Sequence, residues 1–147
     1  MINGYIPAAR FLPFLSWTDV AALPDKSNTV IVLPTGAIEQ HGPHLPCSVD
    51  SVISSGVAGH ALARLPAAIP AYAIPPIVYG KSEEHLHFPG TLTLSGDTLL
   101  HTLLEIAESL YRAGFRKLLM INGHGGQPQI LQIACREMRL RHGDFIA

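Results

Sequence analysis

The sequence predicts a three-layer α/β/α domain in which a mainly parallel sheet lies between helices. Three observations support this prediction. Short apolar runs bounded by turn formers recur along the chain, and segments with apolar residues at helical spacing alternate with them. The chain has 147 residues, 48% of them hydrophobic and 14% charged, which suffices for one sizeable core. We therefore expect residues 1–147 to form a single α/β domain.

The first half of the chain is expected to contain a short helical turn, two strands and a helix. The helical turn covers residues 17–23, and the β-branched run 29–34 (TVIVLP) is typical of a buried strand. A loop with two glycines, two prolines and two histidines follows at 35–49, and helical spacing begins at Val52. After a proline-rich loop, the second strand is expected at 74–79.

The second half begins with a polar loop at 80–95 and the clearest amphipathic helix of the chain. One face of this helix carries an apolar stripe of Leu99, Leu103, Ile106 and Leu110. Ser95 or Asp97 can cap its first turn, and Gly114 can end it.

A strand, a glycine-rich turn and a helix follow. Residues 117–121 (KLLMI) form the expected strand, 122–127 the turn, and Pro128 suits the first turn of the last helix. Residues 144–147 are expected to begin a further strand. Ligands of parallel sheets bind at the carboxyl ends of the strands. Because all three polar loops leave such ends, we expect them to converge.

Composition argues against several classes of partner. The net charge of -1 and the lack of a Lys or Arg run predict no nucleic-acid or membrane-surface partner. The start of the chain does not resemble a signal peptide, and the apolar stretch 66–79 is short and rich in proline. Cys47 and Cys135 lack the spacing of a disulfide framework or a metal motif. A cytoplasmic location is therefore expected.

The first group of candidate functional residues is Glu39, His41 and Asp50. Two carboxylates and an imidazole within twelve positions suit a divalent metal ion. In extended backbone, Glu39 and His41 point to the same side, so both can face one site. The alternatives are that Asp50 caps the following helix, that His41 is an ordinary loop histidine, and that Glu39 is solvated.

The second group is the turn 122–126 (NGHGG) between a buried strand and a helix. Its glycines allow the backbone to approach a ligand closely, and His124 is a candidate metal ligand. A phosphate-binding loop and an ordinary tight turn are the alternatives. The phosphate alternative, a small-molecule phosphate binder, is the weaker one because the turn contains no Lys or Arg.

The third group lies in the segment 82–91 (SEEHLHFPGT), which can supply hydrogen bonds or further ligands. We expect Glu83 to be hydrated, as most loop carboxylates are. The roles of Ser82, Glu84 and His85 stay open on the residues alone.

Taken together and in this order, the three segments resemble the creatininase family, that is, creatinine amidohydrolase and its relatives. The matching stretches are 33–50 (LPTGAIEQHGPHLPCSVD), 80–94 (GKSEEHLHFPGTLTL) and 121–127 (INGHGGQ). The alignable region runs from about Trp17 to the end of the chain. The resemblance implies a creatininase-like fold, and we expect its carboxyl-terminal part to be lacking from these 147 residues.

The resemblance also implies a site with two divalent ions, Zn or Mn or both. In it, Glu39, Asp50 and His124 hold one ion, and His41 holds the other together with Asp50 as a bridge. Ser82 matches a position that contacts substrate, and we take His85 as a second candidate for substrate binding. The implied activity is metal-dependent hydrolysis of a non-peptide C–N bond in a small amide, cyclic or open-chain, such as creatinine. A homo-oligomer is expected from the resemblance alone.

The sequence departs from the family pattern at two positions. In creatininase itself, the last ligand of the second ion is a Glu two residues after the metal-binding His, where this chain has Gly126. In relatives with NGHGG, we expect that Glu, and the proton-donating His, in a later segment containing His-Ala-Gly. Gln127 stands where Asn is common, a change of little expected consequence. The alternative function is a truncated or degenerate metal-binding module without turnover.

Overall fold

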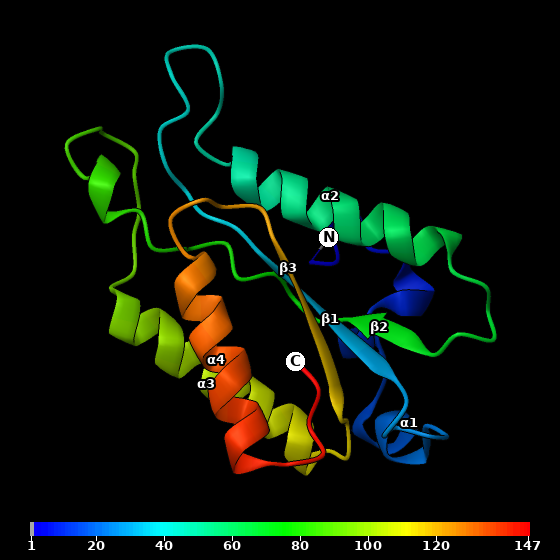
Figure 1. Ribbon diagram of the computed structural model, residues 1–147. Coiled ribbons are helices and arrows are strands. Elements are labelled where there is room, and N and C mark those ends of the chain that lie inside the picture. Colours follow the sequence, from blue (N-terminus) through cyan, green and yellow to red (C-terminus); the bar gives the residue numbers. More distant parts are fainter. Residues whose placement is uncertain (1) are drawn as a thin grey trace.

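The computed structural model describes residues 2–147 and has a three-stranded parallel sheet at its centre (Figure 1). The middle strand is β1 (Val30–Thr35), with β2 (Ala71–Ala73) on one side and β3 (Lys117–Asn122) on the other. The side chains of β1 are almost all buried, as expected for a central parallel strand covered on both faces.

Helices cover both faces of this sheet and complete the predicted three layers. Helix α2 (Val49–Arg64) packs on one face, where its Ala58 and Leu62 meet Val32 of β1. Helices α3 (Gly96–Arg112) and α4 (Pro128–Arg141) lie together on the other face (Figure 1). Their apolar side chains and those of β1 and β3 form the larger core cluster. The predicted fold class is thereby confirmed.

The helix ends follow from local sequence. Ser95 caps α3, its hydroxyl oxygen accepting a hydrogen bond from the Thr98 amide at 3.2 Å, and Gly114 follows the helix at φ +100°. Pro128 occupies the first turn of α4, as predicted. The short α1 (Trp17–Ala22) begins with a capping box between Ser16 and Asp19. Short 3-10 turns cover Ala8–Arg10, Leu12–Phe14 and Glu83–His85.

The second strand lies earlier than predicted. The sequence placed it at 74–79, whereas β2 is Ala71–Ala73, and beyond it only Ile77 makes an isolated bridge to Thr35. Pro75 and Pro76 interrupt the run, and proline has no N–H to donate to the ladder. At the end of the chain, Ile146 makes one parallel bridge to β3, which agrees with the expected start of a further strand.

The connections after β1 and β3 leave the sheet toward opposite faces. Helix α2 follows β1 on one face, and α4 follows β3 on the other (Figure 1). Such a change of side between neighbouring parallel strands opens a crevice at their carboxyl ends, where α/β proteins bind ligands. Among residues 2–147, no helix is long and apolar enough to cross a membrane.

Candidate metal centre

The polar loops converge at the carboxyl ends of β1 and β3, as the sequence predicts. Glu39 lies in the loop after β1, Asp50 in the first turn of α2, and His124 in the turn after β3. The three residues are 6%, 6% and 3% exposed. Ser82, from the loop between β2 and α3, is fully buried with its hydroxyl oxygen 3.3 Å from His124 Nε2.

His124 stands at the centre of this cluster. Its Nδ1 atom lies 2.8 Å from Asp50 Oδ2 and 3.3 Å from Glu39 Oε1, and its Nε2 atom lies 2.8 Å from the backbone carbonyl oxygen of Lys81. His124 therefore joins elements of all three polar loops.

His41 has a similar environment on the other side of Asp50. Its Nε2 atom lies 2.9 Å from Asp50 Oδ1, and its Nδ1 atom lies 3.2 Å from the backbone carbonyl oxygen of Glu39. The two oxygens of Asp50 thus face two different imidazoles, which is the arrangement of a carboxylate that can bridge two ions.

Both imidazoles are surrounded by hydrogen-bond acceptors. A neutral imidazole carries one N–H, and each of these rings can donate it to a backbone carbonyl. The lone pair of the other nitrogen then faces a carboxylate oxygen, which is repulsive unless a proton or a cation lies between them. Metal-ligating histidines in proteins commonly donate the remote N–H to a carbonyl in this way. The residues present therefore fit a divalent cation.

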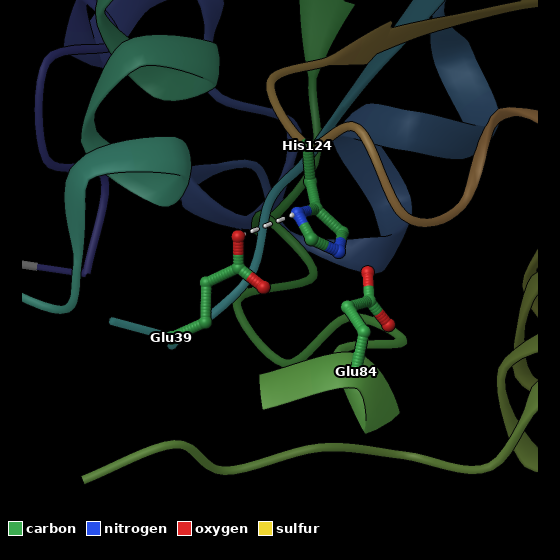
Figure 2. Close-up of side chains that lie close together, drawn as sticks. All are labelled: Glu39, Glu84 and His124. Carbon is green, nitrogen blue, oxygen red and sulfur yellow. Dashed lines mark ion pairs between the residues drawn. The ribbon is translucent and has the colours of Figure 1, made fainter. Parts of the chain in front are cut away.

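The buried carboxylates support the same conclusion. Glu39 and Asp50 both lie near His124, and two buried negative groups are costly side by side without a cation. Their ion-pair partners within residues 2–147 are histidines, which are cationic only when protonated. Two sets of three side chains each offer ligand atoms that lie within 4.8 Å of one another. One set is Glu39, His41 and Asp50, and the other, drawn in Figure 2, is Glu39, Glu84 and His124.

The pKa of His41 is raised above its usual value. Partial burial acts against protonation, but the Glu39 carbonyl and the Asp50 carboxylate together outweigh it. A proton can thus occupy the position between His41 and Asp50 that a metal ion would take.

Asp50 does not cap helix α2, contrary to the alternative drawn from the sequence. The N-cap residue is Ser48, whose side chain makes no capping hydrogen bond, and Asp50 lies inside the first turn. Its carboxylate points to the two histidines instead.

The third segment divides into buried and exposed positions. Glu83 forms an exposed ion pair with Lys81 at 3.1 Å, in line with the expected hydrated side chain. His85 is about one-third exposed, with its Nδ1 atom 3.3 Å from Gln40 Nε2 and its Nε2 atom 4.0 Å from Glu39 Oε2. The substrate-binding roles of Ser82 and His85 stay predictions.

The glycine-rich turn packs closely on helix α2. A Cβ atom at Gly123 would lie 2.4 Å from the backbone carbonyl oxygen of Asp50, so only glycine fits there. The turn thereby presents His124 to two carboxylates. Neighbouring carboxylates repel an anion, which disfavours the alternative of a phosphate-binding loop.

Gln127, whose difference from the common Asn was expected to have little consequence, is a positioning residue. Its fully buried side-chain amide donates to the Gly36 carbonyl at 3.3 Å and to Asn122 Oδ1 at 3.0 Å, while its oxygen accepts from the Lys81 amide at 3.3 Å. One side chain thus ties the three loops together. No sequence pattern marks this role, because the partners are distant in the chain.

Two further side chains fix the ligands locally. Asn122 Nδ2 donates to the His124 carbonyl at 2.7 Å, and its Oδ1 accepts from the His124 amide at 3.2 Å, which holds the turn. Ser51 donates to the Ala37 carbonyl at 3.0 Å and ties the first loop to α2. The ligand positions are therefore held by neighbouring side chains.

Fold and site together define an α/β protein with a buried carboxylate–histidine cluster at the carboxyl ends of its strands. Comparison with known proteins places it more closely. Residues 13–147 match the Creatininase family, described as creatinine amidohydrolase, and the chain belongs to this family.

Relatives of known name include a mycofactocin precursor peptide peptidase of Mycobacterium ulcerans (strain Agy99), 39% identical over 120 residues that cover 78% of this chain and 47% of the relative. Creatinine amidohydrolase of Pseudomonas putida is 34% identical over 138 residues, which cover 88% of this chain and 52% of the relative. A solved structure described as "Creatininase Mn" superposes with a TM-score of 0.78 at 34% identity, and the match covers 92% of this chain and 55% of that structure's chain. The chain spans about half the length of the curated relatives it matches.

Proposed function

We propose that this chain belongs to a metal-dependent amidohydrolase that cleaves an amide C–N bond. Glu39, Asp50 and His124 would hold one divalent ion, and His41 together with Asp50 would hold a second. The observation that carries the proposal is that each histidine has one nitrogen at a backbone carbonyl and the other at a buried Asp50 oxygen.

Mixed carboxylate and imidazole ligands suit Zn or Mn. A bound divalent cation supplies a Lewis acid that activates water and polarises the amide carbonyl. The protein contributes position: Asp50 fixes the separation of the two histidines, and Gln127 holds the three loops in register. Such preorganisation lowers the barrier without rearrangement at the moment of reaction.

Substrate binds beside the loop that carries Glu39 and His41. A cavity of about 330 Å³ is lined there by Gln40, Gly42, Pro43, Cys47, Phe88 and Pro89. Gln40 lies between the two ligands in sequence and contacts His85. We assign His85 and Ser82 to substrate binding, with His85 on the open side of the site.

The substrate is a small amide, cyclic or open-chain, with a non-peptide C–N bond, such as creatinine. The relative from Pseudomonas putida bears the name of that reaction. A peptide amide is the second candidate, because the relative with 39% identity is named as a peptidase of a peptide precursor. Both substrates require water to attack an amide carbonyl, so one metal centre serves either.

A metal-binding module without turnover is the alternative function. It is favoured by Gly126, which offers no ligand at the position where creatininase itself has a Glu for the second ion. Under this alternative the chain binds a cation but hydrolyses nothing.

The cellular location and the partners are proposed from composition and from the family resemblance. Cys47 and Cys135 are unpaired, which suits a reducing cytoplasm. The net charge of -1 argues against nucleic acid or an anionic membrane as partner. A homo-oligomer is proposed from the family resemblance.

The test is turnover of the purified chain, loaded with Mn or Zn, on creatinine, small cyclic amides, formamides and a peptide amide. We expect slow hydrolysis of one substrate that EDTA abolishes and metal re-addition restores. The chain with the single substitution His124→Ala, assayed in the same way, serves as the background control. Hydrolysis unaffected by EDTA would contradict the proposal, and tight metal binding with no hydrolysis of any substrate would favour the module without turnover.

A further inference from the structure

Glu84 reaches toward the ligand cluster from the 3-10 turn Glu83–His85. Although the residue is exposed, its Oε1 atom lies where a side chain at position 126 would begin: a Cβ atom built on Gly126 would be 2.6 Å from it. The same Cβ would be 2.6 Å from His124 Nε2. The space left by the absent side chain at Gly126 therefore brings the Glu84 carboxylate beside His124 (Figure 2).

Glu39 offers an unsatisfied oxygen to this space. Its Oε1 atom faces His124, whereas its Oε2 atom is buried without a hydrogen-bond partner among residues 2–147. The side chain is 8% exposed. Figure 2 shows this second oxygen directed between His124 and Glu84. The His85 imidazole stays at 4.0 Å, beyond hydrogen-bond distance.

A buried carboxylate oxygen without a partner is costly, and a cation is the partner that satisfies it. Glu39, Glu84 and His124 each offer a ligand atom within 4.8 Å of the other two. In a tetrahedral site with ligands at about 2.1 Å, the ligand atoms lie about 3.4 Å apart. From separations of up to 4.8 Å the three ligand atoms therefore have to close by at most about 1.4 Å, which the long, exposed side chain of Glu84 can supply.

We propose that Glu84 is a ligand, together with Glu39 and His124, of a divalent ion on the solvent side of the cluster. An ion there is held through Nε2 of His124, so that the imidazole proton lies on Nδ1, toward Asp50, instead of on Nε2, toward the Lys81 carbonyl. This inference rests on the proposed metal site and adds a residue that the family resemblance does not assign. The proposed role of Glu84 also explains why position 126 is a glycine, because any side chain there would displace Glu84 and His124.

Glu83 provides a matched comparison within the same turn. It carries the same charge one position earlier, but its carboxylate pairs with Lys81 Nζ at 3.1 Å rather than with the cluster. Replacing either glutamate by glutamine removes one negative charge near the site. Only Glu84→Gln removes a ligand.

The test is competitive titration of the full chain with Mn²⁺ and Zn²⁺ against a chelating indicator. We expect Glu84→Gln to weaken binding on the order of 100-fold, at the upper end of what lost support of a metal site costs. Glu83→Gln should stay within about threefold of wild type, since exposed charges are screened. Equal affinities of the two variants would overturn the proposal. Circular dichroism of the metal-free variants checks that both are folded.

A His124→Ala arm separates this inference from the proposed function. If His124→Ala loses the ion and Glu84→Gln does not, only the role of Glu84 fails. If neither changes metal affinity, the metal site itself fails. Hydrogen exchange supplies a second readout: added metal should protect the amides around 83–86 in wild type and in Glu83→Gln but not in Glu84→Gln, and protection in all three would also count against Glu84.

Discussion

The Nδ1 atom of His124 lies 2.8 Å from Oδ2 of Asp50, a residue 74 positions earlier in the chain. This contact joins the turn after β3 to the first turn of α2, across the crevice where the connections diverge to opposite faces of the sheet. Both side chains are buried, so the carboxylate depends on a proton or a metal ion for its charge balance.

The first prediction concerns the charge of Asp50. Asp50→Asn keeps the shape but removes a carboxylate that faces both histidines, so metal affinity should fall strongly at both ions. A role in helix capping would leave this variant nearly silent, since Asn caps as well as Asp. Mass spectrometry of bound metal after dialysis measures the difference. Wild-type metal content in Asp50→Asn would exclude the bridging role.

A second comparison is between the metal content of His41→Ala and that of Asp50→Ala. His41 contacts one oxygen of Asp50, whereas Asp50 contacts both histidines. Asp50→Ala should therefore lose more metal than His41→Ala. The reverse order would mean that Asp50 does not bridge.

The second prediction is that metal stabilises the fold. An ion at 100 times its Kd adds about 2.7 kcal/mol, provided that it binds only the folded chain. For a chain of this size, that corresponds to an increase in Tm of roughly 5–10 °C. Differential scanning calorimetry with EDTA and after re-addition of Mn or Zn measures it, and superimposable melting curves would speak against a metal site.

The third prediction is that lowering the pH stabilises the metal-free protein but weakens metal binding. In the metal-free protein, the raised pKa of His41 means that its protonation stabilises the fold, a contribution present below about 6.5 and lost as pH rises past the raised pKa. The metal-bound state requires neutral histidines. The gain in Tm on adding metal should therefore shrink as pH falls through the pKa of His41. A gain constant from pH 8 to 5.5 would contradict this.

The fourth prediction uses two neighbouring glycines. In Gly126→Ala the new Cβ would lie 2.5–2.6 Å from the Lys81 carbonyl oxygen, Glu84 and His124, whereas at Gly125 nothing lies within 4 Å. Gly126→Ala should lower stability by about 1–3 kcal/mol and weaken metal binding. Gly125→Ala should change stability by less than about 0.5 kcal/mol. Urea unfolding and metal titration of the pair provide the measurement, and equal behaviour would refute the close approach.

The sequence predicted the layers because parallel strands and amphipathic helices leave clear periodic patterns. The stripe of α3 and its Ser95 cap illustrate this. The second strand was misplaced because the apolar run continues past β2 into Pro75 and Pro76, where hydrophobicity persists but ladder hydrogen bonding cannot. An apolar run in the sequence therefore predicts which residues are buried better than it predicts which residues pair with a neighbouring strand.

The convergence of the loops was also predictable, since each leaves the carboxyl end of a strand. The contacts of Glu84 and Gln127 were not. Glu84 is exposed, and its approach to His124 depends on the path of a loop that carries little periodic signal. Gln127 bonds to loops 46 and 91 positions away, a separation that local patterns do not encode.

The measurement that tests the central claim most directly is metal stoichiometry and affinity of the 147-residue chain by isothermal titration with Zn²⁺ and Mn²⁺. Glu39, Asp50 and His124 should hold one ion tightly, while His41 with shared Asp50 holds a second weakly or not at all. His124→Ala should abolish the tight site. A wild-type chain that binds no ion, or a His124→Ala chain that keeps the tight ion, would contradict the account.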